Sequence, residues 1–174
     1  ENVLSSGNLR FVNSTRRDPR HREHLQLPVP LAAPRQIPEV VAIREVHRRH
    51  GHIQEVIVQN FTPRPAIPMA DTAEPSDDAM AHAVAMARLI LPPEVSVQSP
   101  PNLNPTRTSL LLRAGINDFG GISPVTPDYI NPRHAWPHLA GLAEECEREG
   151  FALRPRLPVY DSYIDGEGWL DAGL

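Results

Sequence analysis

From residue 38 onward, segments whose apolar residues follow helical spacing alternate four times with short runs typical of β-strands. Such alternation implies a parallel sheet whose strands are joined by right-handed crossovers. We therefore predict an α/β fold of about four helix–strand units. The helices are expected at 38–51, from 76, at 105–115 and at 137–150, and the strands at 52–60, 94–98, 116–121 and 151–160.

The number of units limits the architecture further. A complete (β/α) barrel has eight units and takes about 250 residues. This chain has 174 residues, and its hydrophobic content of 40% is enough for a buried core. The sequence therefore predicts either an open sheet or an incomplete barrel.

The segment before residue 38 does not share the alternating pattern. Residues 1–37 are polar, rich in Arg and broken by prolines, and only LQLPVPLAAP offers one short strand. We therefore divide the chain into a divergent N-terminal segment, 1–37, and a partial (β/α) barrel domain, 38–174.

Capping residues and prolines set the expected ends of the elements. Ser76 and Asn104 are expected to cap the starts of the second and third helices. Gly51 and Gly150 are expected to end the first and fourth helices. Pro155 places the last strand near a sheet edge, because proline lacks the N–H that a central strand needs.

Apolar residues define the faces that we expect to be buried. The run Val56–Val58 is typical of a strand covered on both faces. Two helices carry apolar stripes at helical spacing, and these stripes are expected to pack on the sheet. They consist of Met80, Ala83, Val84 and Ala87 in one helix, and of Leu139, Leu142, Ala143 and Cys146 in the other.

Polar residues follow three successive strands, at the edge where parallel sheets bind their ligands. Because the carboxyl ends of parallel strands meet at one edge, we expect these side chains to share the rim of one substrate pocket. They are Gln59 and Asn60 after the first strand, Gln98 and Asn102 after the second, and Asn117 and Asp118 after the third.

The stretch AGINDFGGISPVTPDYINP contains the most unusual residues of this rim. Asp118 is our candidate catalytic residue, which would orient a substrate or accept a proton; the alternative is a carboxylate that caps local backbone N–H groups. Gly120 and Gly121 would let the backbone approach a ligand closely, or would simply form a turn. Ser123 and Thr126 would bind a hydroxylated chain of the ligand, although both are also common in turns.

Charge and composition exclude several classes of protein. The net charge of -4 and the aromatic content of 5% argue against a nucleic-acid-binding module, although nine of the 17 basic residues lie in the first 50 positions. A single cysteine is typical of a reducing compartment. No stretch has the roughly 18 apolar residues of a membrane span, and the N-terminus lacks the apolar core of a signal peptide. We expect a cytoplasmic protein with neither membrane nor nucleic acid as partner.

The spacing of several histidines is compatible with a metal site, but the set of metal ligands is incomplete. His47 and His50 lie three residues apart on one expected helix face with His52 just beyond, and His21 and His24 share that spacing. No carboxylate or thiolate is placed to complete a ligand set. A solvated basic face is therefore the preferred interpretation, and we predict no metal site.

Three stretches resemble a known family: HRRHGHIQEVIVQNF, VQSPPNL and, most specifically, AGINDFGGISPVTPDYINPRHAWPHL. They are similar to the deazariboflavin synthase family of the radical SAM superfamily, in the half called CofG. The resemblance runs from about residue 38 to residue 174. It implies that the chain is the C-terminal part of a radical SAM (β/α) TIM-like barrel.

The resemblance also implies a reaction and its cofactors. Family members hold a [4Fe-4S] cluster on a CxxxCxxC loop and cleave S-adenosylmethionine to a 5'-deoxyadenosyl radical. The radical closes a deazaflavin ring from a tyrosine-derived adduct of a ribitylaminouracil, and ammonia is released. The implied activity is that of a radical SAM lyase in deazaflavin coenzyme biosynthesis.

Two departures from the family pattern limit what this chain does by itself. A cluster of this kind needs three thiolates, and the chain has only Cys146. Where the family has a glycine-rich strand end that helps hold S-adenosylmethionine, this chain reads LPVPLAAPRQIP, whose prolines remove backbone donors. We therefore expect no activity without the missing N-terminal half-barrel and the CofH-type half of the synthase. The alternative is a non-catalytic relic that binds a flavin-like ligand or a partner half-barrel.

Overall fold

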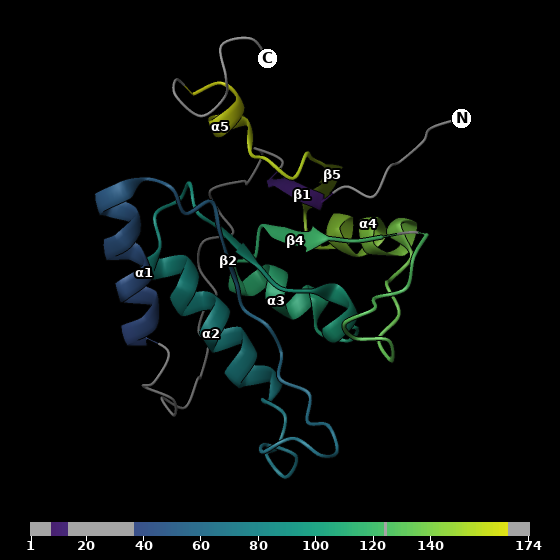
Figure 1. The fold of residues 1–174 in the computed structure, drawn as a ribbon. Helices are drawn as coiled ribbons and strands as arrows, with labels where there is room; N and C mark the ends of the chain where they lie inside the picture. The colour runs from purple at the N-terminus through teal and green to yellow at the C-terminus, as the bar shows by residue number, and fades with distance from the viewer. Residues whose placement is uncertain (1–7, 14–36, 124, 167–174) are drawn as a thin grey trace.

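A computed structural model describes residues 8–13, 37–123 and 125–166 of the protein (Figure 1). Its helices and strands alternate from residue 37 onward, as the sequence predicts. In chain order they are β1 (Asn8–Asn13), α1 (Ile37–His50), β2 (Glu55–Ile57), α2 (Asp77–Ile90), β3 (Ser96–Gln98), a 3-10 helix (Pro101–Leu103), α3 (Thr108–Ala114), β4 (Asp118–Gly121), α4 (Leu139–Arg148), β5 (Phe151–Pro155) and α5 (Asp161–Ile164).

The strands form one five-stranded sheet in the order β2-β3-β4-β1-β5. The pairs β2–β3 and β3–β4 are parallel, which confirms the predicted α/β class for this part of the chain. β1 pairs antiparallel with both β4 and β5, so β5 runs in the same direction as β4 without pairing with it. β5 lies at the edge of the sheet, as Pro155 predicts.

The position of β1 is a finding that the sequence did not predict. The strand lies inside the segment 1–37, which we could not assign, and it separates β4 from β5. The short strand expected in LQLPVPLAAP falls outside the described residues. β1 was not recognised because its sequence, NLRFVN, alternates over too few residues to stand out from a polar segment.

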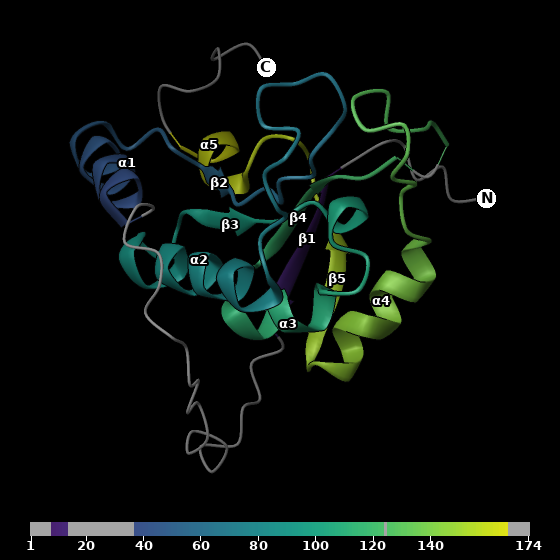
Figure 2. The same ribbon diagram turned by 90° about the horizontal axis from the view of Figure 1, so that it is seen from below.

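Three helices pack on one face of the sheet, and the other face carries polar residues and α5. Figures 1 and 2 show α2, α3 and α4 on one side and α5 on the opposite side. The hydrophobic core lies between the sheet and the first three of these helices. Its fully buried members include Val84 from α2, Leu111 and Leu112 from α3, Cys146 from α4 and Val97 from β3.

Local signals correctly predicted most helix ends. The hydroxyl of Ser76 accepts a hydrogen bond from the Ala79 N–H at 3.2 Å and caps α2, as expected. α1 ends at His50, directly before Gly51, and α4 ends at Arg148, two residues before Gly150. The predicted stripe of α2 is buried throughout.

Asn104 does not cap α3, which is a correction to the sequence interpretation. Its amide turns back and donates to the Ser99 hydroxyl at 3.1 Å and to the Pro100 carbonyl at 2.9 Å. The side chain is therefore used to close the loop before the helix. α3 begins later, at Thr108, with Arg107 in the capping position.

The prediction that residues 56–58 are covered on both faces is also wrong. Val56 and Val58 pack against the core, but Ile57 is 53% exposed. β2 is the other edge strand of the described sheet, so the face away from the helices is only partly covered there. Among the described residues, no helix is both long enough and apolar enough to cross a membrane.

The only cysteine in the sequence, Cys146, is fully buried in the core. Burial raises the pKa of its thiol to about 12, and the nearby Glu145 carboxylate adds to this effect. The thiolate is the reactive form of cysteine, and burial removes it almost entirely. We expect iodoacetamide to modify Cys146 in denaturant at least roughly 100-fold faster than in the folded protein. Prompt labelling of the folded chain, measured by mass spectrometry, would contradict this placement.

Candidate functional site

Three strands place polar side chains on the sheet face that is opposite the core. Successive side chains of a strand point to opposite faces. Because Val97 and Phe119 face the core, Gln98 and Asp118 face away from it. Gln98 and Asp118 are register partners in neighbouring strands, and Glu55 lies on the same face of β2. We call this surface the polar face.

Arg156, which follows β5, joins the two carboxylates of the polar face. Its Nε donates to Asp118 Oδ2 at 2.7 Å, and its Nη2 donates to Glu55 Oε2 at 3.1 Å. Its Nη1 donates to the carbonyl oxygens of Leu157 and Pro158. Burial by itself would lower the pKa of Arg156, but the hydrogen bond and the charge of Asp118 outweigh it and raise the pKa. The guanidinium therefore stays charged inside the fold.

Tyr160, which directly precedes α5, contacts both carboxylates of the polar face. Its hydroxyl lies 2.9 Å from Glu55 Oε2 and 3.0 Å from Asp118 Oδ2, and it accepts from Arg156 Nη2 at 3.0 Å. The Arg156 guanidinium also lies 4.0 Å from the centre of the Tyr160 ring. Burial raises the pKa of Tyr160 well above its usual range, and the charge of Asp118 adds to this rise. The phenol therefore keeps its one proton, which it donates to one of the two carboxylates at a time.

We call Glu55, Gln98, Asp118, Arg156 and Tyr160 the polar-face cluster. By formal charge it contains two carboxylates and one guanidinium, so one negative charge is unbalanced. Asp118 is completely buried, whereas the Glu55 side chain is 28% exposed. Glu55 Oε2 accepts from Gln98, Arg156 and Tyr160, but Oε1 accepts no hydrogen bond from the described residues. Glu55 therefore offers the accessible acceptor of the cluster.

Asp118 lies in the strand and not after it, because β4 begins at this residue. Its Oδ1 accepts from the Gly120 N–H at 2.7 Å, and its Oδ2 is shared by Arg156 and Tyr160. Both oxygens are thus occupied. Its predicted role in orienting a substrate or accepting a proton stays a prediction, and direct contact with a substrate requires Arg156 or Tyr160 to give up a bond.

The side chains of Asn117, Asn60 and Asn102 form hydrogen bonds with other residues of the chain. Asn117 Oδ1 accepts from the Val97 N–H at 2.9 Å, and this bond holds β4 against β3. Asn60 donates to the Leu103 carbonyl at 3.2 Å, and Asn102 donates to Asp128 at 2.8 Å. Gln59 is exposed. The amides that we predicted on one rim therefore divide between loop support, strand pairing and the polar face.

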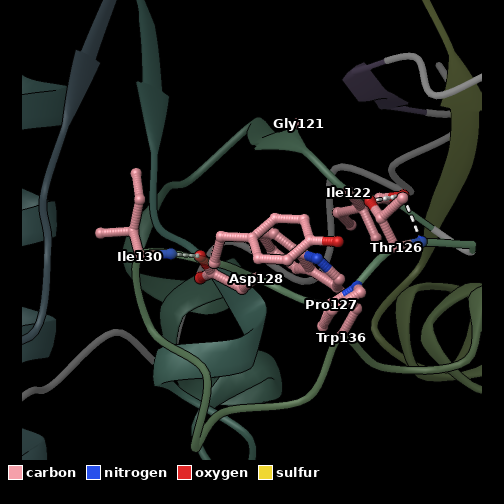
Figure 3. Close-up of a pocket in the computed structure, with 9 residues that line it drawn as sticks. Gly121, Ile122, Thr126, Pro127, Asp128, Ile130 and Trp136 are labelled. Atoms are coloured by element: carbon pink, nitrogen blue, oxygen red, sulfur yellow. Dashed lines mark hydrogen bonds between the residues drawn. The ribbon is translucent and has the colours of Figure 1, made fainter.

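A cavity of about 330 Å³ lies beyond the carboxyl end of β4 (Figure 3). It contains three of the predicted binding residues, Gly121, Ser123 and Thr126. Figure 3 shows Ile122 and Thr126 on one side of the view and Ile130 on the other, with Asp128, Pro127 and Trp136 between them. The remaining lining residue is Tyr129.

The sequence interpretation missed Glu55, Arg156 and Tyr160. Glu55 could have been found, because it precedes Val56, which packs against the core, and so must point to the opposite face. Arg156 and Tyr160 follow β5, and no pattern in the neighbouring sequence indicates which residues they contact. Among the described residues, no group of three His, Cys, Asp or Glu side chains is arranged to hold a metal ion.

Comparison with curated proteins finds relatives that share one name, 7,8-didemethyl-8-hydroxy-5-deazariboflavin synthase. The Methanopyrus kandleri relative is 52% identical over 132 residues, which cover 76% of this chain and 39% of the relative. The Methanocaldococcus jannaschii relative is 49% identical over 128 residues, with coverage of 74% and 35%. The Methanothermobacter thermautotrophicus relative is 45% identical over 128 residues, with coverage of 74% and 39%.

The chain is a partial homologue of the 7,8-didemethyl-8-hydroxy-5-deazariboflavin synthases. This finding confirms the family resemblance that the sequence motifs carry. The chain spans between 35% and 39% of the length of these three relatives. No family model matches the chain, and no solved structure matches it.

The residues of this chain do not fit the iron–sulfur cluster that the synthase family implies. Three thiolates are required, and the one cysteine of the sequence is buried in the core of the sheet–helix layer. Cys146 also lies on the core side of the sheet, away from the polar face. No step of a reaction can therefore be assigned to a cluster held by this chain alone.

Gly120 gives a direct test of how tightly the polar face is packed. Its φ is +70°, and a Cβ at this position would lie 2.9 Å from Gln98 Oε1. We expect Gly120→Ala to destabilise the protein by roughly 1–3 kcal/mol, because both the backbone conformation and the space disfavour a side chain. Gly141→Ala in α4 is the matched control: it has open space, and it should be neutral or stabilising by up to about 1 kcal/mol. Equal effects of the two substitutions in denaturant unfolding would refute the close approach.

Proposed function

We propose that this chain forms part of the substrate-binding wall of a deazariboflavin synthase, which closes the deazaflavin ring by radical SAM chemistry. The identity of 45–52% to synthases in three organisms supports the proposal. The single structural observation that carries it is the polar-face cluster. A domain that needed only stability would gain little from burying two carboxylates and one guanidinium on a sheet face.

The polar face provides a specific contact for the substrate. Glu55 Oε1 accepts no hydrogen bond within the described part of the chain, so we propose that it receives an N–H or O–H donor of the substrate. Arg156 and Tyr160 hold Glu55 Oε2, which fixes the direction of the other oxygen. Asp118 holds both Arg156 and Tyr160 and is therefore proposed as a positioning residue. Preorganised polar groups of this kind favour one orientation of a bound molecule.

The exposed edge of the sheet at β2 supports a proposal for where the rest of the synthase would bind. β2 is an edge strand of the described sheet, and its Ile57 is 53% exposed on the polar face. In a (β/α) barrel, another strand pairs with such an edge, and the polar face becomes the barrel interior. We propose that further parts of the synthase cover this edge and supply the three thiolates and the binding site for S-adenosylmethionine. In that assembly, the present chain binds and orients the substrate.

A chimeric synthase tests this function. The 132 matched residues of the Methanopyrus kandleri synthase would be replaced by the corresponding residues of this chain, and the product would be measured by chromatography and mass spectrometry. We expect the chimera, assayed together with the CofH-type half of the synthase, to form 7,8-didemethyl-8-hydroxy-5-deazariboflavin. Asp118→Asn in the chimera should lower the rate by roughly 100-fold, because it loosens the groups that position the substrate.

Asp77→Asn is the matched control for this experiment. Asp77 is an exposed carboxylate at the start of α2 and pairs only with Arg107 among the described residues. The control chimera should keep the full rate. A folded chimera without activity would contradict the proposed function, and so would equal rates for the Asp118 and Asp77 variants.

A further inference from the structure

The segment that follows β5 turns back over the polar face. It consists of residues 156–166, which we call the strap, and it includes α5. Figures 1 and 2 show α5 on the side of the sheet that faces away from α2, α3 and α4. Arg156 and Tyr160 of the strap form hydrogen bonds with Glu55 and Asp118. The strap therefore lies against both carboxylates of the polar face.

Few apolar contacts hold the strap in place. Leu157 and Val159 are 63% and 42% exposed, and Ile164 in α5 is 36% exposed. The hydrophobic cluster between the sheet and the helices includes no described residue after Leu153. α5 has only four residues, which is too short for a helix that is stable by itself. A segment with so little buried apolar surface detaches at a lower free energy than the core unfolds.

Polar contacts attach the strap at both of its ends. At its start, Arg156 and Tyr160 bind the two carboxylates of the polar face. Near its end, the Tyr163 hydroxyl donates to the Gly51 carbonyl at 3.3 Å. Gly51 lies between α1 and β2, so this bond ties α5 to the entry of the edge strand.

Detachment of the strap has different consequences from loss of one of its side chains. A substitution of Arg156 leaves Asp118 covered and without its counter-ion, which is strongly unfavourable. When the strap detaches as a whole, water hydrates the carboxylates and the guanidinium together. The lost attraction and the regained hydration then largely offset each other, because a buried ion pair gains little over hydrated charges. The detached form is therefore a minor state of the folded protein.

We propose that the strap opens to admit a ligand to the polar face and then closes on it. In the open state, Glu55, Gln98 and Asp118 are accessible from solvent. In the closed state, Arg156 and Tyr160 return to Glu55 Oε2 and fix the direction of its other oxygen. Closure therefore completes a site that the sheet alone provides only in part, as closing segments of binding sites do.

The opening of the strap rests on the proposed function only in taking the ligand to be the substrate of the synthase. Opening is a property of the chain itself and is measured without substrate and without the rest of the synthase. Its failure is therefore separate from failure of the chimeric synthase to form product. An active chimera whose strap never opens would overturn the present proposal and leave the proposed function intact.

A thiol placed under the strap tests the opening. Ser96 is 1% exposed and lies on the polar face beside its register partner Glu55. Burial raises the pKa of Tyr160, and the Ser96 hydroxyl next to it opposes the rise. Ser96→Cys is therefore a small change at a position that Tyr160 covers. Cys146 is the internal reference, because it lies in the core on the other side of the sheet.

Both thiols would be labelled with iodoacetamide in the full 174-residue chain and quantified by mass spectrometry. We expect the introduced thiol to react roughly 100-fold faster than Cys146 and roughly 100-fold slower than in the denatured chain, as for an open state populated at about 1%. Urea at about 1 M should accelerate the labelling of Cys146 at least five-fold. It should leave the introduced thiol nearly unchanged, because opening of the strap exposes little surface.

Tyr163→Phe should favour the open state without altering the polar-face cluster. Loss of this one hydrogen bond should accelerate the labelling of the introduced thiol roughly three- to ten-fold. Tyr129→Phe is the matched control, because it removes the same hydroxyl from an 81% exposed residue of the loop after β4. This control should leave the labelling rate as it is.

The parent chain gives a second readout that needs no added thiol. N-acetylimidazole acetylates accessible phenols, and the sequence has three tyrosines that peptide mass spectrometry distinguishes. Tyr129 is exposed and should react at once. Tyr160 should react slowly, at a rate that urea at about 1 M leaves nearly unchanged and that Tyr163→Phe raises roughly three- to ten-fold.

Three results would overturn the opening of the strap. The first is labelling of the introduced thiol at the rate of Cys146 and with the same dependence on urea, because the strap then detaches only when the core unfolds. The second is labelling as fast as in the denatured chain, because the strap then does not cover the polar face. The third is acceleration by Tyr163→Phe of Cys146 alone, or of neither thiol.

Discussion

Arg156 is the residue on which the polar face depends. It joins Asp118, which is completely buried, to Glu55, which comes from the edge strand 101 residues earlier in the sequence. A buried carboxylate such as Asp118 is stable only when it is paired and hydrogen-bonded, and Arg156 pairs both with it and with the partly exposed Glu55. Because Arg156 follows β5 directly, the same contacts also hold the segment from Arg156 to Tyr160 against β2 and β4. The contacts of Arg156 therefore also position Tyr160 and α5 on the sheet.

The division of the sheet into two faces underlies the binding function that we propose for this chain. The helices bury the apolar side chains on one face, and the alternation within each strand leaves Glu55, Gln98 and Asp118 on the other. The cavity lies next to this polar face, beyond the end of β4, and is enclosed by a loop that Asp128 organises. The polar face and the cavity thus both include residues of β4. This arrangement is the basis on which we propose that the chain binds the substrate of a deazariboflavin synthase.

The sequence predicted what local chemistry determines. The cap at Ser76, the stripe of α2 and the ends of α1 and α4 all depend on residues within one or two turns. The role of Asn104 was wrong because its amide had two nearby acceptors in its own loop, and β1 was missed because its partners are more than 100 residues away. The polar-face cluster could be predicted only in part, since strand alternation places Glu55, Gln98 and Asp118 together but says nothing about Arg156 and Tyr160. Ion pairs between residues far apart in the sequence produce no regular spacing by which they could be recognised.

A double-mutant cycle of Asp118 and Arg156 tests the central claim most directly. The free energy of unfolding would be measured for the parent chain, Asp118→Asn, Arg156→Gln and the double variant. If one guanidinium neutralises the buried carboxylate, each single substitution leaves a charge unpaired, and the double variant should be more stable than the sum of the two losses implies by about 2 kcal/mol or more. Additive losses, within about 0.5 kcal/mol, would show that the two residues act independently and would contradict the account.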